Sequence, residues 1–337
     1  MYFFFLYIVS VILLTFYLKK KKLLSNYTGE HHQLFSNQKN IPLVGGIFLL
    51  IPIILAEYQN IIYTITIFLT FLLGFLSDRK LLISAKKRLL FQITLVFLSV
   101  IFLDLEILSS KLTFFDNFLK NSVFNIFFTT FCLLILINGS NFIDGLNGLL
   151  LCYMTSIIFA LSNSGLLNFF LLNEILLTYF IFFLIILILL NFCNLLMLGD
   201  AGAYVISFFV GYLIIKCHIS NLNISPYFFI TILWYPCFEN LFSIIRKFKS
   251  NFSPLVPDNN HLHQLIYTLF KKKLIKDKLF ANNLSSILVS AVNFLIILIS
   301  TKNPYSSIYQ IKLMIFSVFI YLIVFVLIKK KLNYKSK

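Results

Sequence analysis

Long apolar runs recur along the whole chain, and they restrict the folds that it can adopt. The runs lie near residues 2–18, 42–56, 60–77, 89–103, 123–138, 148–162, 175–193, 203–216, 226–245, 284–300 and 311–328. Several are shorter than the roughly 20 residues that a helix needs to cross a bilayer, which polytopic proteins tolerate where a segment packs against protein. Because 60% of the residues are hydrophobic and only 12% are charged, polar groups cannot cover the apolar surface. We expect an all-α, polytopic integral membrane protein with about eleven transmembrane helices.

The basic residues indicate how these helices are oriented. The first run is followed at once by the four lysines Lys19 to Lys22, whereas a cleavable signal peptide has its charges before the apolar region. If the N-terminus lies outside, all but five of the 28 Lys and Arg residues fall in cytoplasmic segments, the exceptions being Lys111, Lys120, Lys216, Lys302 and Lys312. This bias is the positive-inside pattern. It predicts an external N-terminus, a cytoplasmic C-terminus and one membrane-embedded domain over residues 1–337.

The net charge of +16 does not indicate nucleic acid binding. The basic residues form short clusters between apolar runs, with no long basic stripe, and the membrane orientation accounts for them. We expect a lipid bilayer as the surrounding medium and no nucleic acid partner.

The few carboxylates lie at the ends of the apolar runs. Asp78, Asp144, Asp200 and Asp258 all fall in segments assigned to the cytoplasm, and none lies near the middle of a run. Carboxylates of ion-coupled carriers tend to lie near the bilayer midplane. The pattern favours an enzyme at the membrane surface, with a transporter or lipid flippase as the alternative.

Two polar segments stand out within this apolar chain. The segment 138–148 contains three glycines with Asn141, Asp144 and Asn147, which offer oxygen ligands for a metal and amide donors for phosphate or sugar. The alternative is that the segment is a plain turn that binds no ligand. The second segment places Asp200 between Gly199 and Ala201, where the carboxylate suits either Mg²⁺ binding or a simple helix cap.

Two further groups could contact phosphates. His261 and His263 lie in the long basic segment 246–283, and their spacing does not favour a zinc pair. They suit a diphosphate or a nucleotide, and the alternative is a pair of exposed loop histidines. Lys87 and Arg88, beneath the run at 89–103, could seat a phosphate or only anchor the topology.

Taken in order, these segments resemble the polyprenyl-phosphate N-acetylhexosamine-1-phosphate transferase family. The resemblance runs from about Pro42 to Gln264. Its elements are Pro42 with Gly45-Gly46, then Ser77-Asp78 with Lys87-Arg88, then Asn141 to Gly148, then Gly199 to Gly202, and finally Pro236, Glu239 to Arg246, Pro257-Asp258 and His261 to His263. Each element alone is weak, but five in the right order are a specific signal.

Two departures from the family pattern bear on mechanism. The family usually has paired aspartates where this chain has Ser77-Asp78, and Gln264 replaces the next histidine of a longer motif. An aspartate of that pair is often proposed as a base toward the polyprenyl phosphate. A phosphate monoester is already largely dianionic at pH 7, so the reaction does not require this base. Asp78 could instead orient a basic residue or assist Mg²⁺.

The resemblance implies a transfer of a sugar 1-phosphate, GlcNAc-1-phosphate by default, from a UDP-N-acetylhexosamine to undecaprenyl or another polyprenyl phosphate. The catalytic residues would be Asp78, Asp144 and Asp200. Mg²⁺, or alternatively Mn²⁺, would be held by Asp200 and Asn141. The substrate-binding residues would be Asn141, Asn147, Lys87, Arg88, His261 and His263.

The same resemblance implies where the protein works. It would be a multi-pass protein of the bacterial inner membrane, with the active site on the cytoplasmic face, and it would initiate synthesis of a cell-envelope polysaccharide. A homodimer is compatible with this role. An enzyme like the phospho-MurNAc-pentapeptide translocase is the alternative within the family.

Overall fold

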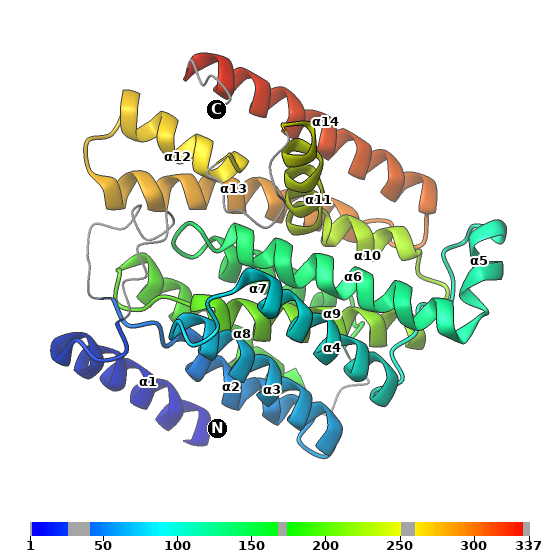
Figure 1. The fold of residues 1–337 in the computed structure, drawn as a ribbon, viewed down its shortest axis with the longest axis horizontal. Helices are drawn as coiled ribbons and strands as arrows, with labels where there is room; N and C mark the ends of the chain where they lie inside the picture. Colours follow the sequence, from blue (N-terminus) through cyan, green and yellow to red (C-terminus); the bar gives the residue numbers. More distant parts are fainter. Residues whose placement is uncertain (1, 26–40, 168–173, 251–259, 333–337) are drawn as a thin grey trace.

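The computed structural model describes residues 2–25, 41–167, 174–250 and 260–332, and all its long elements are helices (Figure 1). Within these ranges the only contact of β type is an isolated bridge between Leu43 and Met197. The all-α prediction is confirmed. The helices are α1 (Tyr2–Lys21), α2 (Gly45–Ala56), α3 (Ile61–Asp78), α4 (Ala85–Phe102), α5 (Thr113–Leu119), α6 (Ser122–Ile143), α7 (Leu149–Asn163), α8 (Glu174–Phe192), α9 (Gly199–Ser220), α10 (Pro226–Ile232), α11 (Trp234–Lys249), α12 (Leu262–Lys273), α13 (Lys278–Thr301) and α14 (Ser307–Lys331).

The apolar runs of the sequence all fall on helices. Five of the described helices, α3, α6, α9, α13 and α14, are long and apolar enough to cross a membrane, and the bent pair α10 and α11 would make a sixth. The helices α2 and α7 and the described part of α8 are apolar but shorter. These features indicate a membrane protein, whereas the count of eleven spans and the orientation stay predictions.

The run at 226–245 forms two helices, which meet at an angle of 75°. Pro236 supplies the physical reason, because a continuous helix would need its missing N–H to bond the carbonyl of Ile232. Pro236 is tolerated in the first turn of α11, where no such bond is required. The chain therefore turns at Leu233, and α11 leaves the direction of α10 (Figure 1).

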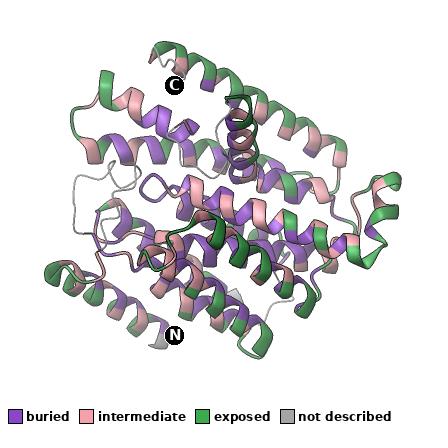
Figure 2. Ribbon diagram, viewed as in Figure 1, coloured by how far each residue is buried: buried purple, intermediate pink, exposed green. Residues whose placement is uncertain are grey.

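Helix α9 lies at the centre of the bundle and is almost entirely buried (Figure 2). It packs against α2, α3 and α6. The start of α9 approaches its neighbours closely, since a Cβ on Gly46 would lie 2.6 Å from the backbone nitrogen of Gly202. A Cβ on Gly74 would likewise collide with the backbone of Ala201. These glycines let the end of α3 and the start of α2 touch the first turn of α9.

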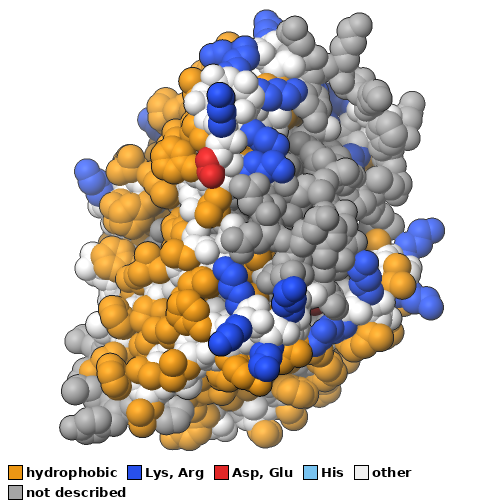
Figure 3. Space-filling view, turned by 90° about the vertical axis from the view of Figure 1, so that its left-hand side faces the viewer, with side chains coloured by type: hydrophobic (Ala, Val, Ile, Leu, Met, Phe, Trp, Pro, Cys, Tyr) orange, Lys and Arg blue, Asp and Glu red, His pale blue; other side chains and the backbone are white. Residues whose placement is uncertain are grey.

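The surface divides into apolar flanks and a basic end. Large side chains such as Phe127, Leu295 and Phe316 are at least half exposed, as expected for helices that face lipid. Lys and Arg gather at the end of the bundle that lies on the left in Figure 1, and Figure 3 shows this end face on. Basic residues occupy the last turns of α1, α11, α12 and α14.

Candidate functional site

The end of α3 holds the start of α9 through Asp78. Its Oδ1 accepts a hydrogen bond from the backbone N–H of Asp200 at 2.8 Å, and its Oδ2 accepts one from Ala201 at 3.1 Å. Gly199 precedes them with a φ of 74°, and a Cβ there would lie 2.6 Å from Asp78 Oδ2. A carboxylate at a helix N-terminus satisfies free N–H groups and opposes the helix dipole. Asp78 therefore fixes the position of Asp200, and its catalytic role stays a prediction.

Asp200 contacts two side chains from neighbouring helix ends. Ser77 donates its hydroxyl to Asp200 Oδ2 at 2.6 Å, and Arg88 Nη1 lies 3.2 Å from the same oxygen. Arg88 also donates to Ser77 Oγ at 2.9 Å. The ion pair is partly open to solvent, with the two side chains 30% and 18% exposed. Lys87, the other predicted phosphate ligand, is exposed at the start of α4.

Asp144 lies in the turn that follows α6, close to this group. Burial, followed by the negative charges of Asp200 and Asp78, raises the pKa of the Asp144 carboxyl well above its usual range. In the described part of the chain no side chain or backbone group donates a hydrogen bond to the carboxyls of Asp144 or to the amide of Asn141. A cation is stabilising where several carboxylates of like charge lie close together.

The donor set fits a magnesium ion that is held by few protein ligands. Within residues 2–25, 41–167, 174–250 and 260–332, no three His, Cys, Asp or Glu side chains converge closely enough to hold a metal by themselves. Mg²⁺ commonly uses one or two carboxylates, with water and substrate phosphates completing its shell. Asp200, Asp144 and Asn141 are available for that arrangement. The predicted metal ligands Asp200 and Asn141 thus stay a prediction that the geometry permits.

Asn147 takes part in a buried network of asparagines. Its backbone N–H donates to Asn282 Oδ1 at 2.9 Å, and its side-chain amide donates to Asn194 at 2.8 Å and to Asn283 at 3.2 Å. The neighbouring Gly148 N–H donates to Asn191. These amides join the turn at 144–148 to α8 and α13. Asn147 is 7% exposed, so its described contacts hold the turn, and substrate binding by its side chain stays a prediction.

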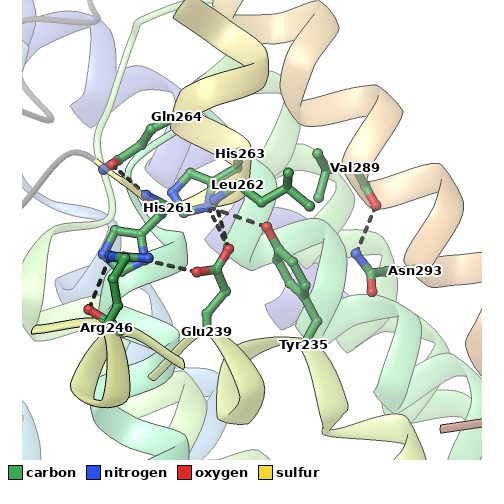
Figure 4. Close-up of polar contacts among 10 residues, drawn as sticks. Tyr235, Glu239, Arg246, His261, Leu262, His263, Gln264, Val289 and Asn293 are labelled. Carbon is green, nitrogen blue, oxygen red and sulfur yellow. Dashed lines mark hydrogen bonds and ion pairs between the residues drawn. The ribbon is translucent and has the colours of Figure 1, made fainter. Parts of the chain in front are cut away.

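The two predicted histidines meet a buried carboxylate, Glu239, on α11 (Figure 4). The Nδ1 of His261 lies 2.9 Å from Glu239 Oε2, and the N–H of Leu262 donates to Oε1 at 3.0 Å. The Nδ1 of His263 lies 3.8 Å from Oε1 and 3.3 Å from the hydroxyl of Tyr235. Burial lowers the pKa of His263, although Glu239 opposes this shift. Glu239 therefore sets the orientation of the histidine pair.

The histidines lie at the start of a helix, whereas the sequence suggested a loop. His261 is the N-cap of α12, and its side chain and that of Gln264 form a capping box. His261 thus has an extended backbone, and the usual i, i+2 spacing along a helix does not apply to the pair. Their rings stack at a centroid distance of 5.6 Å. Pro257 and Asp258, just before them, lie outside the described residues.

The segment 138–148, which is the end of α6 and the turn after it, joins the carboxylates to the histidines. A Cβ on Gly145 would lie 3.3 Å from His263 Nε2, and the ring of Phe142 lies 5.1 Å from that of His261. Lys247 Nζ lies 5.8 Å from the centroid of the same Phe142 ring. The structure thus brings Asp78, Arg88, Asp144, Asp200 and both histidines to one end of the bundle, and their roles stay predictions.

Sequence reasoning missed two contacts in this region. It gave Glu239 no role, although a glutamate inside the apolar run at 226–245 was a signal that it needed a buried partner. It treated Ser77 only as a departure from a pattern. No sequence signal placed the Ser77 hydroxyl between Arg88 and Asp200.

Comparison with known proteins gives a family match that covers part of this site. The family model for glycosyl transferase family 4 matches residues 60–218, which include Asp78, Arg88, Asp144 and Asp200. No curated protein shows a match to the chain. The resemblance seen in the sequence is confirmed over these residues, which are similar to glycosyl transferase family 4, the family of the polyprenyl-phosphate hexosamine-1-phosphate transferases.

Proposed function

We propose that this membrane glycosyltransferase transfers a sugar 1-phosphate from a UDP-N-acetylhexosamine to a polyprenyl phosphate. The observation that carries the proposal is the convergence of Asp144, Asp200, Arg88 and the histidine pair on the segment 138–148. These groups come from distant parts of the chain, and they combine cation ligands with phosphate donors. By resemblance, we propose GlcNAc as the sugar and undecaprenyl phosphate as the acceptor.

The proposed reaction exchanges one phosphorus–oxygen bond for another. An oxygen of the acceptor phosphate attacks the β-phosphorus of the UDP-sugar. The bond from that phosphorus to the bridging oxygen breaks, and UMP leaves with the electron pair. The product is a polyprenyl diphospho-sugar, and the dianionic acceptor needs no base.

The residues of this chain have three tasks in that scheme. Asp200 and Asp144, with Asn141, supply oxygen ligands on the side of the donor diphosphate. Mg²⁺, when bound there, neutralises the diphosphate and the charge on the leaving oxygen. Lys87 and Arg88 provide positive charge for the acceptor phosphate. His261 and His263 would contact the donor phosphates, and the contact of His261 Nδ1 with Glu239 orients the His261 ring.

The proposal includes a membrane topology. We propose eleven spans, with α10 and α11 as one broken span, an external N-terminus and a cytoplasmic C-terminus. The gathering of Lys and Arg at the end that carries the site supports a cytoplasmic active site in the bacterial inner membrane. UDP-sugars are soluble, so a site at this face would have access to them.

The test is the release of UMP by the purified full-length protein in detergent. We expect release from UDP-GlcNAc only when undecaprenyl phosphate and Mg²⁺ are both present, and EDTA should abolish it. A panel of UDP-sugars in the same assay identifies the donor. Release that does not depend on the lipid, or no release from any UDP-sugar in the panel, would refute the proposal.

A further inference from the structure

The hydroxyl of Ser77 connects three helix ends at the site. It lies in the last turn of α3, donates to Asp200 Oδ2 on α9 at 2.6 Å, and accepts from Arg88 Nη1 on α4 at 2.9 Å. A serine hydroxyl has one donor and two acceptor lone pairs, so both of its functions are used here. Hydrogen bonds to charged groups are stronger than neutral ones.

These contacts involve one carboxylate oxygen of Asp200, and the other oxygen has no described hydrogen bond. Ser77 and Arg88 both donate hydrogen bonds to Oδ2, and the Arg88 bond is 3.2 Å long. In the described part of the chain, Oδ1 of Asp200 receives no hydrogen bond. The carboxylate is thus held by one edge, and its other oxygen is left for a ligand.

The residue type at position 77 also sets the charge of the site. The carboxylates of Asp78, Asp144 and Asp200 already gather there, and Asp78 bonds to the backbone of Asp200 and Ala201. An ionised carboxylate at position 77 could not donate to Asp200 and would repel it. A hydroxyl makes the same contact attractive and adds no charge.

We propose that Ser77 is a positioning residue, whose hydroxyl clamps Asp200 Oδ2 against Arg88 so that Oδ1 is presented to a divalent cation. This inference rests on the proposed function for its catalytic consequence only. The clamp itself acts on cation binding, and it can be measured without either substrate.

The test compares Mn²⁺ binding by purified full-length variants, measured by electron paramagnetic resonance without donor or acceptor. We expect Ser77→Ala to weaken Mn²⁺ binding by roughly tenfold, the loss that corresponds to one hydrogen bond to a charged group. Ser77→Thr keeps the hydroxyl and should stay within about threefold of the wild type. Thr94→Ala removes a hydroxyl of α4 whose hydrogen bond, among the described residues, is to Leu90 of its own helix, and it should change nothing.

Each result has a clear meaning. Wild-type Mn²⁺ affinity in a folded Ser77→Ala protein would overturn the proposal, and so would equal losses in the alanine and threonine variants. If Ser77→Ala does not fold, Ser77→Cys keeps the size with a weaker donor and is judged by the same criterion. In the UMP assay, Ser77→Ala should raise the Mg²⁺ concentration for half-maximal rate with little change in the KM for the UDP-sugar.

The two proposals fail in different ways. An inactive wild-type protein that binds Mn²⁺ in a Ser77-dependent manner would refute the transferase and leave the clamp intact. An active protein whose Mn²⁺ affinity ignores Ser77 would refute the clamp alone.

Discussion

The site has two sides that are built differently. The carboxylate side consists of Ser77, Asp78, Arg88, Asp144 and Asp200 at the ends of α3, α4, α6 and α9, and the side chains of Arg88 and Asp200 are partly open to solvent. The histidine side consists of Tyr235, Glu239, His261, His263 and Gln264, all of which are buried.

The two sides also differ in how their carboxylates are paired. On the carboxylate side, like charges lie together, and Asp144 has no described hydrogen bond to its carboxyl. On the histidine side, the one carboxylate, Glu239, receives two close hydrogen bonds. Carboxylates of like charge suit an ion or ligand that comes and goes, whereas the hydrogen-bonded Glu239 maintains the geometry of the histidines. On the histidine side the buried Nε2 of His263 has no described hydrogen bond.

The largest effect should come from the carboxylate side. Asp200→Asn keeps the shape of the side chain and removes the charge that would meet the cation, so we expect UMP release to fall by roughly a hundredfold or more with little loss of thermal stability. Asp277→Asn is the matched control, because Asp277 is an exposed cap of α13. Near-normal release by Asp200→Asn would remove Asp200 from the chemistry.

The histidine side should show the reverse pattern, with stability affected first. Glu239→Gln places an amide group where His261 or Leu262 needs an acceptor, and leaving a buried donor unpaired costs about 2 kcal/mol of unfolding free energy. Thermal unfolding in detergent measures the loss, with the exposed Glu106→Gln as control. An unchanged unfolding midpoint would mean that Glu239 does not organise the pair.

A smaller effect is expected at the capping box. Gln264→Ala removes the group that accepts the His261 N–H at 3.4 Å, and the loss of a helix cap costs about 1 kcal/mol. The same unfolding measurement applies, and Gln59→Ala, at an exposed position, serves as the comparison. If Gln264→Ala destabilised the protein more than Glu239→Gln, the order of importance on this side would have to be reversed.

The smallest effect is expected at Lys87. Its side chain is exposed, so Lys87→Ala should raise the KM for the polyprenyl phosphate by only about threefold, and added salt should reduce the difference. Lys86→Ala tests whether the effect is local, because Lys86 is exposed one position away. Equal effects of both variants would indicate a general attraction by positive charge, without a specific phosphate contact at Lys87.

The sequence predicted the helices well because a long apolar run has few alternatives in a bilayer. It also predicted which polar segments would meet, since Asp78, Asp144 and Asp200 all lie at run ends on one proposed side. It did not predict the bend between α10 and α11, although Pro236 was a visible signal for it.

The sequence could not predict which residues would contact one another across the fold. Nothing in the spacing says that Asp78 would bond the backbone of Asp200 and Ala201 in another helix, more than a hundred residues away. The same holds for Glu239 and the histidines, because their contact depends on how α11 bends after Leu233. Such contacts are set by packing in three dimensions, whereas motifs record only the residue types.

The asparagine network has a consequence for how much of the chain the site requires. A protein truncated before residue 282 would retain every proposed ligand and donor, from Asp78 to His263. It would lose the Asn282 oxygen that accepts the Asn147 N–H at 2.9 Å, and with it the link from Asn283 to the carbonyl of Phe192. The last two helices therefore bear on activity without contributing a proposed substrate contact, and a minimal enzyme cannot end after the histidines.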